Sequence, residues 1–234
     1  MKWLSAKTMC ATAALSLAAL GSTTSHAAGI EVLNEGFGNV AGLSGWTQVN
    51  NSVPAGNGWF QGNPAVFTSQ SGAADAYAAA SFLGAANGSG SVDNWLITPT
   101  LDLSGTTVLS FYTRHGAEPG FNDLLEVRFA SGAGADPSAF GTLLGSVGGS
   151  AGYPEDWSLF SASLNAEGSG RFAFRYVGPA DTLNYVGLDT VSVVTAVPEP
   201  SAWMMMAMGL AGLGLARRRL GHTSGRTPNH MSHQ

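Results

Sequence analysis

Residues 28–197 contain no lysine and no cysteine, and their single histidine is His115. The one cysteine of the chain, Cys10, lies near the N-terminus. Without cysteine this segment can form neither a disulfide nor a thiolate metal site. With one imidazole it also lacks the two or three histidines that a zinc site without cysteine needs. Its stability must therefore come from burial of apolar surface, for which about 170 residues are enough.

The same segment is short of positive charge. Four arginines stand against fourteen aspartates and glutamates, which gives residues 28–197 a formal charge of −10, compared with −5 for the whole chain. Such a field repels nucleic acids and anionic lipid surfaces, and it favours solubility or cation binding. We therefore expect no nucleic-acid partner.

The first 27 residues have the features of a signal peptide. Lys2 and Lys7 precede a short apolar run at residues 9–20, and Ser25 and Ala27 supply the small residues that signal peptidase requires before its cleavage site. We expect signal peptidase to cleave after Ala27 and the remaining chain to be exported.

The segment from residue 28 to residue 196 is typical of β-structure. Apolar and polar residues alternate in residues 124–130 and 171–177, and β-branched or aromatic residues are frequent in residues 107–115, 157–164 and 185–195. No sustained helical period occurs there. Short strands separated by turn residues predict an all-β fold, an antiparallel two-sheet sandwich. Residues 130–152 are rich in Gly, Ser and Ala, and we expect this region to include a long surface loop.

Several short motifs of this segment resemble the choice-of-anchor J domain, a relative of the cleaved-adhesin and MAM-like jelly rolls. Residues 94–99 (NWLITP) and 101–104 (LDLS) are the most specific, with residues 35–37 (EGF) before them and residues 187–193 (GLDTVSV) after them. The resemblance implies a jelly-roll sandwich over residues 28–196 on an exported bacterial protein. It implies no known reaction.

Two patterns of catalytic residues occur, and neither predicts an enzyme. Residues 148–152 (GGSAG) match the G-x-S-x-G nucleophile elbow, but they are flanked by a glycine-rich loop instead of a strand and a helix. His115 is expected to face solvent or to form a hydrogen bond. Carboxylates that cluster in sequence, Glu118, Asp123 and Glu126, do not by themselves place a pair across a cleft as a glycosidase needs. We expect no enzyme, and a carbohydrate-active enzyme is the less favoured alternative.

Calcium is the favoured metal, because it prefers several carboxylate and carbonyl oxygens and this segment is rich in acids. Related jelly rolls often hold a calcium ion that joins the first and last strands. By that resemblance Glu35 and Asp189, with Asp93, are the candidate ligands. The alternative is that these acids occupy turns and strand edges without a metal.

Aromatic side chains could also form a glycan-binding platform. Most tryptophans of a sandwich lie in the core, and Trp95, within an apolar run that Pro99 ends, is expected there. Trp59 has polar neighbours, Asn57, Gln61 and Asn63, and it is the candidate exposed glycan-binding residue.

The C-terminal segment contains an uncharged apolar run at residues 202–216. As a helix this run would be about 22 Å long. It is shorter than the roughly 20 residues that a helix needs to cross a membrane unassisted. Flanking residues and snorkelling arginines could close this gap, so we expect a single transmembrane helix. Arg217, Arg218 and Arg219 place its C-terminal end in the cytoplasm.

Pro198, Glu199 and Pro200, the apolar run and the arginine cluster together resemble the PEP-CTERM sorting signal over residues 197–219. The resemblance implies recognition by an exosortase at the inner membrane of a Gram-negative bacterium and delivery to the cell surface or extracellular matrix, often with exopolysaccharide and biofilm. Residues 220–234 form a polar cytoplasmic tail that the family usually lacks. Two interpretations remain: an adhesion module that binds a polysaccharide or a surface protein, and a structural surface or periplasmic protein with an uncleaved anchor.

Overall fold

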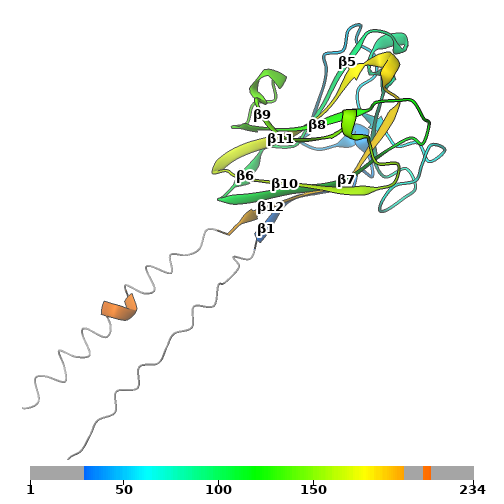
Figure 1. Ribbon diagram of the computed structural model, residues 1–234. Coiled ribbons are helices and arrows are strands. Elements are labelled where there is room, and N and C mark those ends of the chain that lie inside the picture. Colours follow the sequence, from blue (N-terminus) through cyan, green and yellow to red (C-terminus); the bar gives the residue numbers. More distant parts are fainter. Residues whose placement is uncertain (1–28, 198–207, 212–234) are drawn as a thin grey trace, which may run out of the picture.

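The computed structural model describes residues 29–197 and 208–211, and residues 29–197 form two antiparallel sheets packed face to face (Figure 1). One sheet, called sheet A, has the order β10-β7-β12-β4-β3, and β1 also pairs with β12. Its strands are β1 (Gly29–Glu35), β3 (Phe60–Gln61), β4 (Ala78–Ser81), β7 (Thr106–His115), β10 (Ser158–Asn165) and β12 (Tyr185–Ala196).

The second sheet, sheet B, has the order β2-β5-β11-β8-β9, and β6 also pairs with β11. Its strands are β2 (Thr47–Asn50), β5 (Ser91–Ile97), β6 (Leu101–Leu103), β8 (Leu124–Ser131), β9 (Thr142–Gly148) and β11 (Gly168–Pro179). The helical turns between the strands are short 3₁₀ turns: η1 (Val40–Gly42), η2 (Phe82–Gly84), η3 (Ala86–Gly88), η4 (Pro137–Ala139), η5 (Gly149–Ala151) and η6 (Ala180–Thr182). Residues 208–211 are helical.

Strand β12 runs along the length of the sandwich. Its start pairs with β4 and its end pairs with β1, so that Gly29 lies opposite Ala196. The first and last residues of the sandwich, Gly29 and Ala196, therefore lie side by side at one end of it (Figure 1). Tyr185, the first residue of β12, lies about 36 Å away along the strand, at 3.3 Å per residue.

The hydrophobic core fills the space between the sheets, as period-2 alternation predicts. Phe172, Phe174 and Tyr176 of β11 are fully buried and face Leu109 and Phe111 of β7 in one cluster. Each such side chain contributes roughly 1.5–3 kcal/mol on burial. Of the residues that the structure describes, those that form the twelve strands and the three hydrophobic clusters all lie within residues 29–197.

A loop covers part of the outer face of each sheet. On sheet A, residues 62–77 place Phe67 and Tyr77 over Ala79, with Trp157 and Tyr185 against them. On sheet B, Phe140 from the β8–β9 loop packs against Trp95 and its neighbours. These loops explain why aromatic residues occur on both faces of some strands.

The predicted all-β antiparallel sandwich is confirmed, and the five segments favoured by alternation or by β-branched and aromatic residues are β7, β8, β10, β11 and β12. The region of residues 130–152 includes a loop between β8 and β9, but its residues 142–148 form β9, which was not predicted. Its composition conceals the strand: Gly145 gives β9 little β-propensity, but a Cβ there would lie 2.9 Å from the Phe160 ring, so the position needs glycine.

The predicted signal peptide (residues 1–27), the polar tail (residues 220–234) and most of the predicted transmembrane helix (residues 202–216) lie outside the described residues. Within residues 29–197 and 208–211, no helix has the length and apolar character needed to cross a membrane.

Candidate functional site

A hollow of about 510 Å³ opens at the end of the sandwich where β12 begins. Four stretches that are distant in sequence line it: Phe60 of β3 and Val66 of the 62–77 loop belong to the first, and Leu83 of η2, Glu118 of the β7–β8 loop and Tyr185 of β12 belong to the others. The antiparallel pairing of β12 with β4, and of β4 with β3, brings these segments to one end of sheet A.

Tyr185 lines this hollow, and it forms a hydrogen bond with the fully buried Tyr77. The hydroxyl groups of Tyr77 and Tyr185 are 3.1 Å apart, and the backbone N–H of Asn63 donates to the Tyr185 hydroxyl at 3.0 Å. The Tyr77 hydroxyl donates toward the carbonyl oxygens of Asn63 and Phe67 at 2.8 and 3.0 Å. Burial raises the pKa of both phenols, so both stay neutral near pH 7. A Cβ at Gly62 would overlap the Tyr77 ring, so this packing also requires glycine.

The rim of the hollow combines apolar, amide and acidic groups. Val66 and Leu83 are 46% and 40% exposed, and Asn63 and Asn184 supply side-chain amides. Glu118 is the single acid of the lining, and within residues 29–197 it forms no ion pair. Apolar walls with a few convergent polar groups are typical of binding sites for small molecules and sugar units. A second carboxylate, which glycoside hydrolysis needs, is not among the lining residues.

The carboxylates that cluster in sequence are separated in the structure. Asp123 is 1% exposed, and it accepts hydrogen bonds from the Tyr176 hydroxyl and from the backbone N–H of Asn184. Its other oxygen lies 3.2 Å from Nδ1 of His115. His115 is therefore a hydrogen-bond partner, one of its two expected roles. Glu126 faces the outside of sheet B, away from both Asp123 and Glu118.

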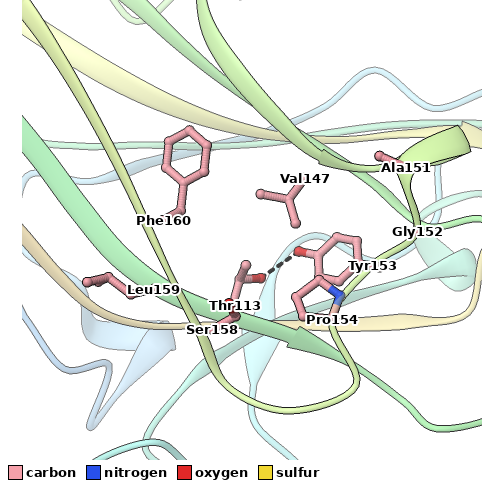
Figure 2. A pocket seen from close by; sticks show the side chains of 9 residues that line it. All are labelled: Thr113, Val147, Ala151, Gly152, Tyr153, Pro154, Ser158, Leu159 and Phe160. Atoms are coloured by element: carbon pink, nitrogen blue, oxygen red, sulfur yellow. Dashed lines mark hydrogen bonds between the residues drawn. The ribbon is translucent and has the colours of Figure 1, made fainter.

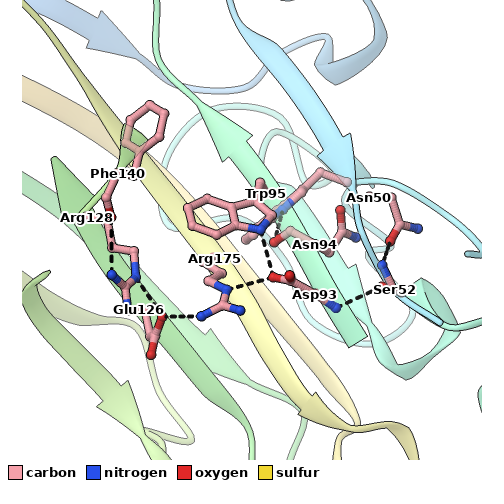
Figure 3. A network of polar contacts seen from close by, with 10 residues as sticks. Asn50, Ser52, Asp93, Asn94, Trp95, Glu126, Arg128, Phe140 and Arg175 are labelled. Carbon is pink, nitrogen blue, oxygen red and sulfur yellow. Dashed lines mark hydrogen bonds and ion pairs between the residues drawn. The ribbon is translucent and has the colours of Figure 1, made fainter. Parts of the chain in front are cut away.

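That outer face of sheet B holds a network of ion pairs (Figure 3). Arg175 donates to Asp93 at 2.6 Å and to Glu126 at 3.1 Å, and Arg128 donates to Glu126 at 2.8 Å. The guanidinium of Arg175 also lies 5.0 Å from the centre of the Trp95 ring. Burial alone would raise the pKa of Glu126, but the hydrogen bonds from Arg128 and Arg175 outweigh it, so this pKa is lowered.

The predicted calcium set is not brought together, and Asp93 is wrong as a member of it. Asp93 binds Arg175 and the Trp95 indole on sheet B, whereas Asp189 lies on sheet A. Asp189 accepts the backbone N–H groups of residues 70, 71 and 190, and it anchors the 62–77 loop. Glu35 accepts the backbone N–H of Phe37 at 2.7 Å. Across the part of the chain that the structure describes, no three His, Cys, Asp or Glu residues form a group suited to a metal. Calcium at Glu35 and Asp189 stays a prediction.

The prediction that Trp59 is exposed is wrong. Trp59 is 4% exposed, packs in the core between the sheets, and directs its indole N–H to the carbonyl of Asn94 at 3.4 Å. The polar neighbours that favoured exposure have structural roles themselves: the Gln61 amide bonds the backbone of residues 37, 40 and 75, and the carbonyl of Asn57 accepts from Asn94. Trp95 is buried, as predicted.

The G-x-S-x-G match does not form a nucleophile elbow, because Gly149–Ala151 is a short 3₁₀ turn between β9 and β10. Pro198, Glu199, Pro200, Arg217, Arg218 and Arg219, the predicted sorting residues, lie outside the described residues. Sequence reasoning missed the hollow, because its lining residues are scattered over more than a hundred positions. The one local signal is Asn63 near Phe60, and only the fold shows that both face Tyr185.

Residues 196–219 match the family model of the PEP-CTERM protein-sorting motif. The motif indicates an exported protein that is sorted to the cell surface, and it implies processing by an exosortase. The matched segment begins at Ala196, the last residue of β12. No curated protein matches the chain in sequence.

The sandwich is similar in structure to the cleaved adhesin domains of Lys-gingipain. The K1 domain from Porphyromonas gingivalis W83 aligns with 70% of this chain and 98% of its own length, with a TM-score of 0.57 and 25% identity. The K3 domain aligns with 72% of this chain and 100% of its own length, with a TM-score of 0.54 and 25% identity. The K2 domain, 20% identical with a TM-score of 0.51, covers 69% of this chain and 98% of its own length.

Proposed function

We propose that this chain is an exported, exosortase-sorted surface protein whose jelly-roll sandwich is a non-catalytic adhesion module that binds a polysaccharide. One observation carries the proposal: a PEP-CTERM motif follows directly on the last strand of a sandwich that has the fold of a cleaved adhesin domain. In this proposal residues 202–216 span the inner membrane until an exosortase processes the chain near Pro198–Pro200.

The position of the hollow supports a binding role. The sorting motif begins where β12 ends, and the hollow lies beside Tyr185, where β12 begins. About 36 Å of strand separates them. A sandwich attached through its C-terminus would therefore present the hollow away from the attachment point, toward whatever the surface meets.

Charge limits the class of polysaccharide. Residues 28–197 carry a formal charge of −10, and the hollow has its own acid, Glu118. Three of the four arginines are engaged elsewhere: Arg128 and Arg175 are paired on sheet B, and Arg171 is buried against the carbonyls of residues 45, 98 and 133. The fourth, Arg114, lies over the Phe67 ring, is not among the residues that line the hollow, and leaves the net charge strongly negative. An acidic polymer would be repelled. We therefore propose a neutral or amino-bearing polysaccharide as the ligand.

Titration of residues 28–197 with neutral, amino-bearing and acidic polysaccharides tests this ligand class. We expect binding to the first or second and none to the third. Leu83→Arg places a long, positively charged side chain at the exposed rim of the hollow and should abolish binding without unfolding the sandwich. Leu143→Arg, on the similarly exposed Leu143 of β9, is the matched control and should bind normally. Equal binding by both variants would reject the hollow as the site, and no binding to any polymer would favour a structural surface protein.

A further inference from the structure

The two sheets differ in how their free edges are protected. An unprotected edge strand exposes N–H and C=O groups that can pair with another strand, and natural sheets use short strands, charges, prolines or bulges to prevent this. Within residues 29–197, β2, β3 and β6 are short, and β1 carries Glu31 and Glu35. Strand β9 has no charge, but a register shift interrupts its pairing with β8.

Strand β10 has none of these protections. Its eight residues, SLFSASLN, contain no charge and no proline, and they pair with β7 without a register shift. No described strand pairs with its other edge. Leu159 on its outer face is 57% exposed. In a segment with a net charge of −10, this edge is an uncharged strip along which a second acidic copy could approach.

The hydrogen bonds of β7 determine which β10 residues point outward. The N–H of Ala166 donates to the carbonyl of Gly105, which continues the β10–β7 register by one pair. In an antiparallel ladder the N–H and C=O groups of one residue point to the same neighbouring strand, and those of the next residue point to the opposite side. Even-numbered residues of β10 therefore bond to β7, and the odd-numbered residues Leu159, Ser161, Ser163 and Asn165 direct their N–H and C=O groups away from it.

We propose that the free edge of β10 pairs with the same edge of a second copy of this chain, antiparallel about a two-fold axis at Ser161. An isologous contact of this kind is self-complementary. The axis places Ser161 opposite Ser161 and Leu159 opposite Ser163, so that three of the four outward residues of each copy are paired within β10.

A hollow lies beside this edge. The hollow, of about 470 Å³, lies between β10 and β9, and Val147, Tyr153, Ser158 and Phe160 are among its lining residues (Figure 2). The proposed register places Leu164 of the second copy opposite Ser158, at the edge of this hollow, but Leu164 packs against the core of its own copy. The contact therefore consists chiefly of backbone hydrogen bonds.

The antiparallel arrangement has a consequence for adhesion. Strand β10 runs along the sandwich axis, and a two-fold axis across it turns the second copy end over end. The two C-terminal ends then point in opposite directions. Copies attached to one surface cannot pair side by side in this way, whereas copies on two facing surfaces can. This bridging rests on the proposed surface attachment, but the pairing itself does not.

Sedimentation velocity of residues 28–197 tests the pairing in solution. One strand pair is a small interface, so we expect a monomer–dimer equilibrium between about 10 µM and 1 mM. Glu155 and Glu167 flank the strand, so added salt should strengthen the dimer. A monomer throughout this range, or oligomers that grow beyond a dimer, would overturn the proposal.

Variants of the central residues test the register. Ser161→Lys places two lysines face to face and should give a monomer, and an equimolar mixture with Ser161→Glu should restore dimers. Ser131→Lys, at an exposed serine of β8, should dimerise normally. Ser161→Pro removes an outward N–H and should keep the Tm, whereas Ala162→Pro removes an N–H that bonds to β7 and should lower it. Equal Tm losses for both prolines would contradict the register.

Beads that carry the domain through its C-terminus test the bridging. Many weak pairs act together between two beads, so clumping reports contacts that are weak one by one. Wild-type beads should clump, Ser161→Lys beads should not, and a mixture of Lys and Glu beads should clump. A dimer in solution whose beads stay dispersed would contradict the opposite direction of the two ends, while leaving the proposed polysaccharide binding untouched.

Discussion

The substitution Tyr77→Phe removes one oxygen atom from beneath the hollow at the start of β12. Tyr77 is fully buried, and its hydroxyl contacts the carbonyls of Asn63 and Phe67 and the hydroxyl of Tyr185. The carbonyl of Asn63 keeps other donors, the N–H groups of residues 66 and 67. The carbonyl of Phe67 and the hydroxyl of Tyr185 each lose a partner.

The expected cost follows from these two losses. A typical intramolecular hydrogen bond contributes about 1 kcal/mol, and phenylalanine preserves the shape of the ring, so we expect a loss of about 2 kcal/mol. For a domain of this size that lowers the Tm by roughly 4–8 °C. Because Tyr77 holds the 62–77 loop, affinity for a polysaccharide bound in the hollow should fall as well.

Calorimetry and amide hydrogen exchange measure the two effects. Exchange should accelerate at residue 63 and at residues 65–67, whose N–H groups belong to this network. Tyr153→Phe is the matched control: its hydroxyl bonds only Thr113, at 2.5 Å, on the other side of β7. The control should lose about 1 kcal/mol and leave the loop protected. An unchanged Tm together with unchanged loop exchange in Tyr77→Phe would refute the reasoning.

Three further predictions concern single positions. Glu126→Gln should lower the free energy of unfolding by about 1–2 kcal/mol at pH 7. Because the pKa of Glu126 is lowered in the folded state, its contribution is present above the unfolded pKa and is lost as the pH falls through the folded pKa. Urea unfolding should therefore show a smaller difference in stability between wild type and variant at pH 3 than at pH 7. Gly145→Val should cost about 1–3 kcal/mol, because its Cβ would press on an aromatic ring of β10, whereas Gly141→Val has open space and should be nearly neutral in thermal melts. If calcium binds at Glu35 and Asp189, the Tm should rise with calcium and fall with chelator, and a melt that neither reagent changes would remove that site.

The parts of the fold that could be predicted from sequence are those with one-sided burial. Apolar and polar residues alternate in strand β11 because Phe172 and Phe174 face the core while Arg171 and Arg175 do not. This alternation does not depend on what packs on the outer face of the sheet. Strand β9 has no such alternation, since it is an edge strand whose central glycine makes room for Phe160. Its neighbours in space determine its conformation, and the local sequence does not show them.

The functional residues were harder to predict, because their roles depend on partners far along the chain. Asp93 has the residue type of a calcium ligand, but Arg175, 82 positions away, takes its carboxylate. The polar residues next to Trp59 in sequence are typical of an exposed position. In the fold, Gln61 and Asn57 instead form hydrogen bonds with groups that are distant in sequence, which the sequence does not reveal. The sorting motif is the opposite case: it is a continuous segment, and it was identified from sequence.

The most direct test of the proposed function is the mature C-terminus. Mass spectrometry of the fractionated cells that produce this protein should find a chain that begins near residue 28 and ends close to residues 197–200, outside the inner membrane. That product would show that the motif at residues 196–219 is used for sorting and is then removed. An intact chain that ends at Gln234 and stays in the inner-membrane fraction would contradict exosortase processing and would favour a permanent anchor.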